Sequence, residues 1–276
     1  MDSGLCALLF DGEKWFHRVL MMRPPLRWDF ALILLALGVL VPWRGAVRMQ
    51  KLLNRPPLST PERLSVYAST IAWQCLAMGL VAWRSVARGV STTHLALAVP
   101  DGALTALAAM GLALLLVANQ LVAMRRLARI PSDRRGRLYK VLATVMPQNP
   151  PEIVVFVALA VTVALCEEFL YRGFVFAAIQ DVAHGSLAAA ALGSSALFAL
   201  AHLYQGRRGL ISTFLIGFAF ALVRIWTGSL LPPIVAHFFL DLTAGLAGSR
   251  VLKLTGPPAP GASSVAVHPE ISEGGR

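Results

Sequence analysis

Charged side chains are scarce in this chain. Asp, Glu, Lys and Arg together make up 14% of its 276 residues, whereas an ordinary soluble domain carries about a quarter. So few charges cannot cover the surface of a soluble protein of this size. The composition therefore excludes a fully solvated globular domain.

Cysteine is also rare, and the three residues Cys6, Cys75 and Cys166 are scattered. This spacing excludes a disulfide framework and a CxxC metal site. The chain has no HExxH motif and no evident internal repeat. The apolar run LCALLF near the start is too short for the core of a signal peptide, so we expect no cleavable one.

Long apolar segments are abundant instead, and 57% of the residues are hydrophobic. About 20 apolar residues are enough to cross a bilayer as a helix. The sequence therefore predicts an all-α, polytopic transmembrane helical bundle with about seven to eight spans. The candidate spans are 64–83, 103–124, 153–179, 186–203, 209–223 and 230–248, with a shorter segment, 30–43, that is either a tilted span or an interfacial helix.

Basic residues outnumber acidic ones by 25 to 14. Their densest stretch, 125–140, directly follows an apolar segment, as cytoplasmic loops of membrane proteins do. We therefore interpret it as a cytoplasmic loop and expect no nucleic-acid partner. Successive loops alternate between the two sides of the membrane, so the loop 84–102 is expected outside and the loop 44–63 inside. The basic amino-terminal segment conflicts with this count, so either 30–43 does not cross or residues 4–22 add membrane-bound structure.

Few ionisable residues lie inside the predicted spans. Each costs about 2.5–3.5 kcal/mol at the centre of a membrane helix on insertion scales, so each requires an explanation. The acidic residues and histidines among them are Glu167, Glu168, His202, His237 and Asp241. All belong to the last four predicted helices, and we expect none deep in the first three. This asymmetry places the chemistry in the carboxy-terminal half.

The spacing of these residues is helical. Glu168 and Arg172 are four apart, so they share a face and can pair. Glu167 points about 100° away and is free to act. Each residue also has a purely structural interpretation, such as a packing pair or a histidine bonded to a backbone carbonyl. Their recurrence on successive helices favours a hydrolytic site, with a base and groups that polarise a carbonyl or bind a metal.

Three ordered motifs, EEFLYR, FALAH and HFFLD, contain Glu167, Glu168 and Arg172, then Phe198 and His202, then His237 and Asp241. They resemble the EExxxR, FxxxH and HxxxN/D motifs of the CPBP (CAAX protease and bacteriocin-processing) family of intramembrane proteases, which includes the type II CAAX prenyl endopeptidases. Three motifs in order are more specific than any one alone. The resemblance implies an intramembrane endopeptidase that hydrolyses a membrane-anchored or lipidated peptide with a glutamate-activated water.

The resemblance also implies residue roles. Glu167 would be the general base, and His202 would position the water. His237 and Asp241 would stabilise the oxyanion, while Glu168, Arg172 and Phe198 would support the site. Many family members have asparagine in place of Asp241, and an ionised aspartate would repel an oxyanion. We therefore expect Asp241 to be protonated, hydrogen-bonded to His237 or bound to a cation.

A divalent metal such as zinc is an alternative, with Glu167, His202, His237 and Asp241 as candidate ligands. We expect no obligatory metal. Two other classes of function also fit buried ionisable residues. One is a non-catalytic membrane scaffold or bacteriocin self-immunity factor, and the other is a transporter.

We divide the chain into four segments. Residues 1–27 form an amino-terminal juxtamembrane segment, and 28–149 contain accessory transmembrane helices and the basic cytoplasmic loop. Residues 150–250 form the CPBP-like catalytic core. Residues 251–276 are rich in Pro, Gly and Ser and are expected to be a disordered tail. We expect a multi-pass protein of the bacterial inner membrane.

Overall fold

The computed structural model describes residues 27–131 and 135–254. All regular structure in these residues is helical. The predicted juxtamembrane segment, apart from Arg27, lies outside the described residues, as does the predicted tail from residue 255. The last helix continues to Leu254, four residues beyond the expected boundary at 250.

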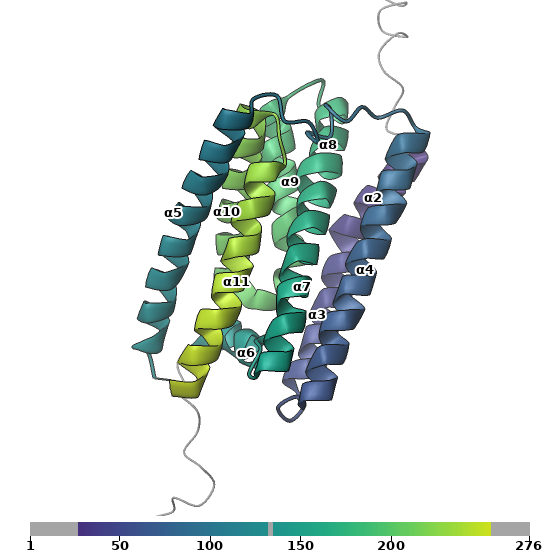
Figure 1. Cartoon of the computed structure of the whole chain (residues 1–276). Coiled ribbons are helices and arrows are strands. Elements are labelled where there is room, and N and C mark those ends of the chain that lie inside the picture. Colours follow the sequence, from purple (N-terminus) through teal and green to yellow (C-terminus); the bar gives the residue numbers. More distant parts are fainter. Residues whose placement is uncertain (1–26, 132–134, 255–276) are drawn as a thin grey trace, which may run out of the picture.

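The helices run up and down between the two ends of the bundle (Figure 1). In the first half of the chain they are α2 (Trp28–Leu35), the π-helical η1 (Ala36–Leu40), α3 (Val41–Leu53), α4 (Thr60–Ala87), α5 (Gly102–Ala128) and the short α6 (Gly136–Val145). In the second half they are α7 (Pro150–Glu167), the π-helical η3 (Glu168–Val175), α8 (Phe176–Val182), α9 (Leu187–Ala201), the 3-10 turn η4 (Leu203–Gln205), α10 (Gly206–Thr227) and α11 (Leu231–Leu254).

Six of the described rods are long and apolar enough to cross a membrane, and α9 is a shorter apolar helix. All seven predicted apolar segments coincide with helices, so the prediction of a polytopic helical bundle is confirmed. The segment 30–43, for which an interfacial helix was an alternative, belongs to a continuous rod of 26 residues, Trp28–Leu53, which is long enough to span.

Polar residues define where several helices begin. Ser59 and Glu62 form a capping box at the start of α4. The Ser59 side chain accepts a hydrogen bond from the backbone N–H of Glu62, and the Glu62 carboxylate accepts one from the backbone N–H of Ser59. At the starts of α5, α7 and α9, a polar side chain accepts a hydrogen bond from a backbone N–H of the first turn. These side chains belong to Asp101, Asn149 and Ser186. Short polar caps between long apolar runs therefore divide the chain into rods.

The outer surface of the bundle is apolar along the rods. Val154 on α7 is 72% exposed, Leu115 on α5 is 66% exposed, and Trp28 at the start of α2 is 69% exposed. Large exposed apolar surfaces mark contact with a membrane or a partner. Together with the length of the rods, this surface identifies a multi-pass membrane protein.

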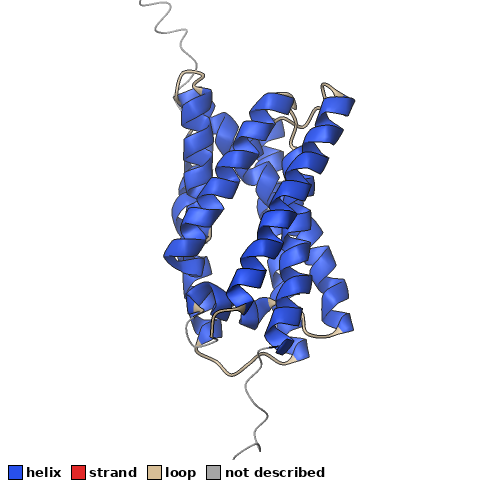
Figure 2. Ribbon diagram, turned by 90° about the vertical axis from the view of Figure 1, so that its left-hand side faces the viewer, coloured by secondary structure: helices blue, strands red, loops and turns tan. Residues whose placement is uncertain are grey.

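The rod formed by α7, η3 and α8 occupies the middle of the bundle. Helix α4 packs along α7, α11 packs against both α7 and α5, and α10 packs along α9. The rods stay roughly aligned in the perpendicular view (Figure 2). All eight residues of η3 are buried. The motif EEFLYR therefore lies at the centre of the fold.

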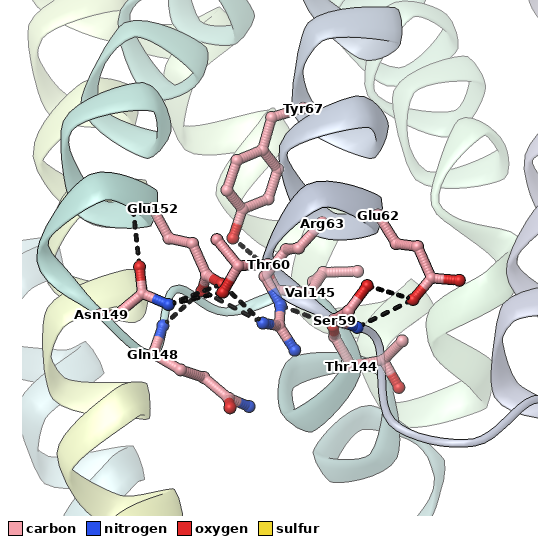
Figure 3. Close-up of polar contacts among 10 residues, drawn as sticks. All are labelled: Ser59, Thr60, Glu62, Arg63, Tyr67, Thr144, Val145, Gln148, Asn149 and Glu152. Carbon is pink, nitrogen blue, oxygen red and sulfur yellow. Dashed lines mark hydrogen bonds and ion pairs between the residues drawn. The ribbon is translucent and has the colours of Figure 1, made fainter.

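A polar cluster, here called the α4–α7 clamp, joins the start of α4 to the start of α7 (Figure 3). Arg63 pairs with Glu152 at 3.0 Å, and both side chains are buried. The backbone N–H of Gln148 and the side-chain amide of Asn149 donate to the same carboxylate. The Tyr67 hydroxyl donates to the backbone carbonyl of Val145, the last residue of α6. The clamp sets the relative position of the two helices.

Candidate active site

Glu167 is the last residue of α7 and lies near the middle of the 33-residue rod Pro150–Val182. Its Oε1 accepts a hydrogen bond of 2.7 Å from the side-chain amide of Gln74 on α4. Its Oε2 lies 3.9 Å from Nε2 of His202. In the part of the chain that the structure describes, Oε2 has no hydrogen-bond partner. One oxygen is thus anchored, and the other faces a histidine.

His202 lies at the carboxyl end of α9, where it caps the helix. Its Nδ1 is 2.9 Å from the carbonyl oxygen of Phe198, which can only accept, so Nδ1 carries the proton. In the neutral ring, Nε2 is then an acceptor. Two acceptors, Oε2 of Glu167 and Nε2 of His202, therefore face each other at a separation that a donor such as water can bridge.

Glu168 has a different set of partners. Its Oε1 lies 3.0 Å from Nη1 of Arg172 and 2.8 Å from Nδ1 of His237. The side chains of Glu168 and Arg172 are completely buried. The structure thus contains the predicted pair of Glu168 and Arg172, four positions apart, and adds His237 from α11 as a third member. Adjacent glutamates consequently face different helices, as the helical spacing indicated.

His237 is buried on α11 and is oriented by Glu168. Its Nε2 lies 3.6 Å from Oδ2 of Asp241, which is slightly beyond hydrogen-bond distance. The Asp241 side chain is 34% exposed, so it lies at the rim of the cluster. Of the three alternatives for Asp241, the hydrogen bond to His237 is therefore not formed in this structure, although the two residues are neighbours.

The ring of Phe198 lies between the two histidines. The guanidinium of Arg172 lies 4.0 Å from the centre of its ring, within the range of a cation–π contact. The rings of His202 and His237 lie 4.7 Å and 6.0 Å from the Phe198 ring. The aromatic ring that the resemblance assigned to support thus separates the two histidines and packs against the buried arginine.

The structure gathers all seven motif residues, but in two groups. Glu167 and His202 form one group, and the other group contains Glu168, Arg172, His237 and Asp241, with Phe198 between the groups. Regular α-helical counting missed the wider π-helical turn that begins at Glu168. Such turns are rare in proteins as a whole, and those that occur are often found at functional sites.

The residues fit a metal ion poorly. Among the described residues, no three His, Cys, Asp or Glu side chains gather closely enough to hold one. We therefore derive no catalytic step through a metal.

Gln74 is the site residue that the sequence analysis missed. Gln74 is not ionisable, and no ionisable residue was expected deep in the first three helices, so the chemistry was expected in the carboxy-terminal half alone. Yet α4 contributes a side chain that contacts Glu167 directly. The signal was present, because Gln74 is the single amide side chain in the apolar run IAWQCLAMGLVAW (71–83).

Residues 149–243, about a third of the chain, match a family described as Rce1-like, type II CAAX prenyl endopeptidase Rce1-like. No curated protein and no solved structure matches the chain. The resemblance indicated by the three motifs is confirmed, and the matched residues 149–243 contain all three motifs.

Proposed function

We propose that this protein is an intramembrane endopeptidase in which Glu167 is the general base. The observation that carries the proposal is the facing pair of acceptors, Oε2 of Glu167 and Nε2 of His202, 3.9 Å apart. A water that donates one O–H to each would be held with its lone pairs toward a third point. That point is where the carbonyl carbon of a peptide bond would be attacked.

In the proposed reaction, the water oxygen attacks the carbonyl carbon while its proton passes to Glu167. The carbonyl oxygen becomes an oxyanion. The tetrahedral intermediate then collapses, the C–N bond breaks, and Glu167 returns the proton to the leaving nitrogen. The products are a carboxylic acid and an amine, and the base is restored. His202 keeps the water in place through Nε2, because its Nδ1 is already bonded to the Phe198 carbonyl.

His237 and Asp241 are the proposed oxyanion groups. Nδ1–H of His237 is directed to Glu168, so a proton on Nε2 would provide a donor on the side of Asp241. Donors placed in advance where negative charge develops contribute strongly to catalysis. A protonated Asp241 would add a second donor, whereas an ionised one would oppose the oxyanion.

The proposed substrate is a membrane-anchored, lipidated or membrane-proximal peptide. The apolar surface of the rods keeps the enzyme in the bilayer, and the base lies mid-rod. A substrate with a lipid anchor would reach this depth without crossing water. The matched family name points to prenylated CAAX peptides as the first class to test. For the location we propose the bacterial inner membrane.

The test uses full-length protein in liposomes with a fluorogenic farnesylated peptide that ends in a CAAX sequence. Glu167→Gln should lower the rate of cleavage by about 100- to 10,000-fold, because it removes the base. Glu62→Gln is the matched control, since glutamine also serves in a capping box. Full cleavage by Glu167→Gln would eliminate Glu167 as the base.

A second readout addresses the scaffold and immunity alternatives. Fragments of the membrane proteome are compared between cells with the wild-type protein and cells with Glu167→Gln. A protease should release fragments that the variant does not. If Glu167→Gln restores a deletion strain completely, the function does not depend on catalysis. Uptake of a solute by proteoliposomes that contain the protein, but not by empty liposomes, would instead indicate a transporter.

A further inference from the structure

We infer that Gln74 is a positioning residue for the base: its amide holds one oxygen of Glu167 so that the other faces His202. This inference rests on the proposed function and adds a residue outside the matched segment 149–243. It makes α4, in the first half of the chain, part of the active site.

The position of Gln74 on α4 is set by helical spacing. Tyr67 and Val81 are buried on α4, and each is seven residues, about two turns, from Gln74. The three residues thus share the face of α4 that packs along the rod formed by α7 and η3. The α4–α7 clamp fixes this face at the start of both helices through Arg63 and Glu152. Gln74 is consequently held opposite Glu167.

The chemistry of the contact suits a base. A carboxylate on a long side chain turns easily about its last torsion. A hydrogen bond of 2.7 Å to Oε1 limits this rotation and leaves Oε2 toward Nε2 of His202. The amide is neutral, so it restrains the carboxylate without forming an ion pair.

The neighbouring acid provides an internal contrast. Glu168 is paired with the buried cation Arg172, while Glu167 receives a neutral donor. A cation in place of Gln74 would stabilise the negative charge and make the base weaker. The two adjacent glutamates thus have partners that suit a structural role in one case and a catalytic role in the other.

The competing interpretation is a hydrogen bond that only stabilises the packing of α4 on α7. Such bonds between membrane helices contribute about 0.6 kcal/mol on average. A packing role predicts a small loss of stability and no specific effect on turnover. A positioning role predicts that turnover falls while substrate affinity stays the same.

The kinetic test compares Gln74→Leu with wild type, using full-length protein in liposomes and the farnesylated CAAX peptide. We expect kcat to fall about 10- to 100-fold with KM unchanged, because misplacing a catalytic group has effects of this size. Gln50→Leu is the matched control, since Gln50 on α3 bonds Asn54 and Arg137, and it should keep the wild-type kcat. A kcat within twofold of wild type, or a rise in KM alone, would overturn the inference.

An infrared test does not depend on activity. The carboxylate band of Glu167 is identified by its loss in Glu167→Gln. In Gln74→Leu this band should shift in frequency, because Oε1 has lost its donor. An unshifted band overturns the inference even if the peptide probe is not cleaved. Wild-type cleavage by Glu167→Gln would instead refute the proposed function, while the band would still report on the Gln74 contact.

Discussion

Oε1 of Glu168 accepts a hydrogen bond of 2.8 Å from Nδ1 of His237, so the second of the paired acids joins η3 to α11. The same oxygen lies 3.0 Å from the Arg172 guanidinium. A single buried carboxylate thus neutralises a buried cation and orients a histidine. Its neighbour Glu167 has neither task.

This difference predicts that removing the two acids will lower stability by very different amounts. Glu168→Ala leaves the Arg172 charge buried and unpaired, which costs about 3–5 kcal/mol of unfolding free energy. Glu167→Ala removes a contact with a neutral amide and should cost about 1 kcal/mol. Unfolding of the purified protein in detergent, followed by circular dichroism, measures both. Glu167→Ala should therefore be folded but inactive, and Glu168→Ala should be markedly less stable. Equal losses of stability would contradict the separation of roles.

Gly217 on α10 provides a steric test of the same region. A Cβ at this position would lie 2.6 Å from Nη2 of Arg172 and 3.1 Å from the Phe198 ring. Arg172 is completely buried and has little room to move. Gly217→Ala should therefore destabilise the protein by about 1–3 kcal/mol, as overpacking does.

The control for this change is Gly111→Ala on α5, where no heavy atom lies within 4 Å of the added carbon. It should leave the unfolding midpoint unchanged or slightly raised, because alanine is the better helix former. Gly217→Ala should also displace Phe198 and thereby lower the cleavage rate. A midpoint for Gly217→Ala equal to that of Gly111→Ala would show that the Arg172 pocket is not tightly packed.

Local relationships along the helices could be predicted from the sequence. The positions of the apolar rods and the pairing of Glu168 with Arg172 depend on residues within one or two turns, and simple periodicity describes them. The three motifs also indicated the family. These features depend on spacing along the chain and require no knowledge of how the helices pack.

Relationships between helices could not be predicted in the same way. Gln74 and Glu167 are 93 residues apart, and Glu168 and His237 are 69 apart. Whether such residues meet depends on the depth and rotation of each rod, which are set by packing. The π-helical turn at Glu168 was missed because the counting assumed 3.6 residues per turn. The roles of the site residues stay predictions.

The α4–α7 clamp leads to a further prediction about stability. Arg63→Ala should cost about 3–5 kcal/mol, because the carboxylate of Glu152 would stay buried without its cation. The double variant Arg63→Met with Glu152→Met should recover most of this loss, since apolar residues of similar volume often replace a buried pair without penalty. Unfolding midpoints of the two variants in detergent provide the comparison.

The clamp variants also test how α4 acts on the site. If the clamp positions Gln74, Arg63→Ala should lower kcat in the protein that remains folded, and the double Met variant should restore part of it. Recovery of stability without any recovery of kcat would show that the polar geometry of the clamp, as well as its packing, matters for the site.

The orientation of the bundle in the membrane is the last prediction. The connection between α4 and α5 lies at one end of the bundle, and α6 lies at the other (Figure 1). Basic residues are concentrated in the stretch 125–140 that leads into α6. Positively charged loops are retained in the cytoplasm. The α6 end should therefore be cytoplasmic, and the α4–α5 connection should lie outside.

Thiol labelling can determine this orientation. In a background with Cys6, Cys75 and Cys166 replaced by alanine, single cysteines are introduced as Thr92→Cys and Lys140→Cys, both at exposed positions. A membrane-impermeant maleimide should label Thr92→Cys in intact cells and Lys140→Cys only in inverted vesicles. The reverse pattern would place the basic loop outside and contradict the charge rule. Labelling of both sites from one side would mean that α5 does not cross the membrane, because α5 is the one long rod between them.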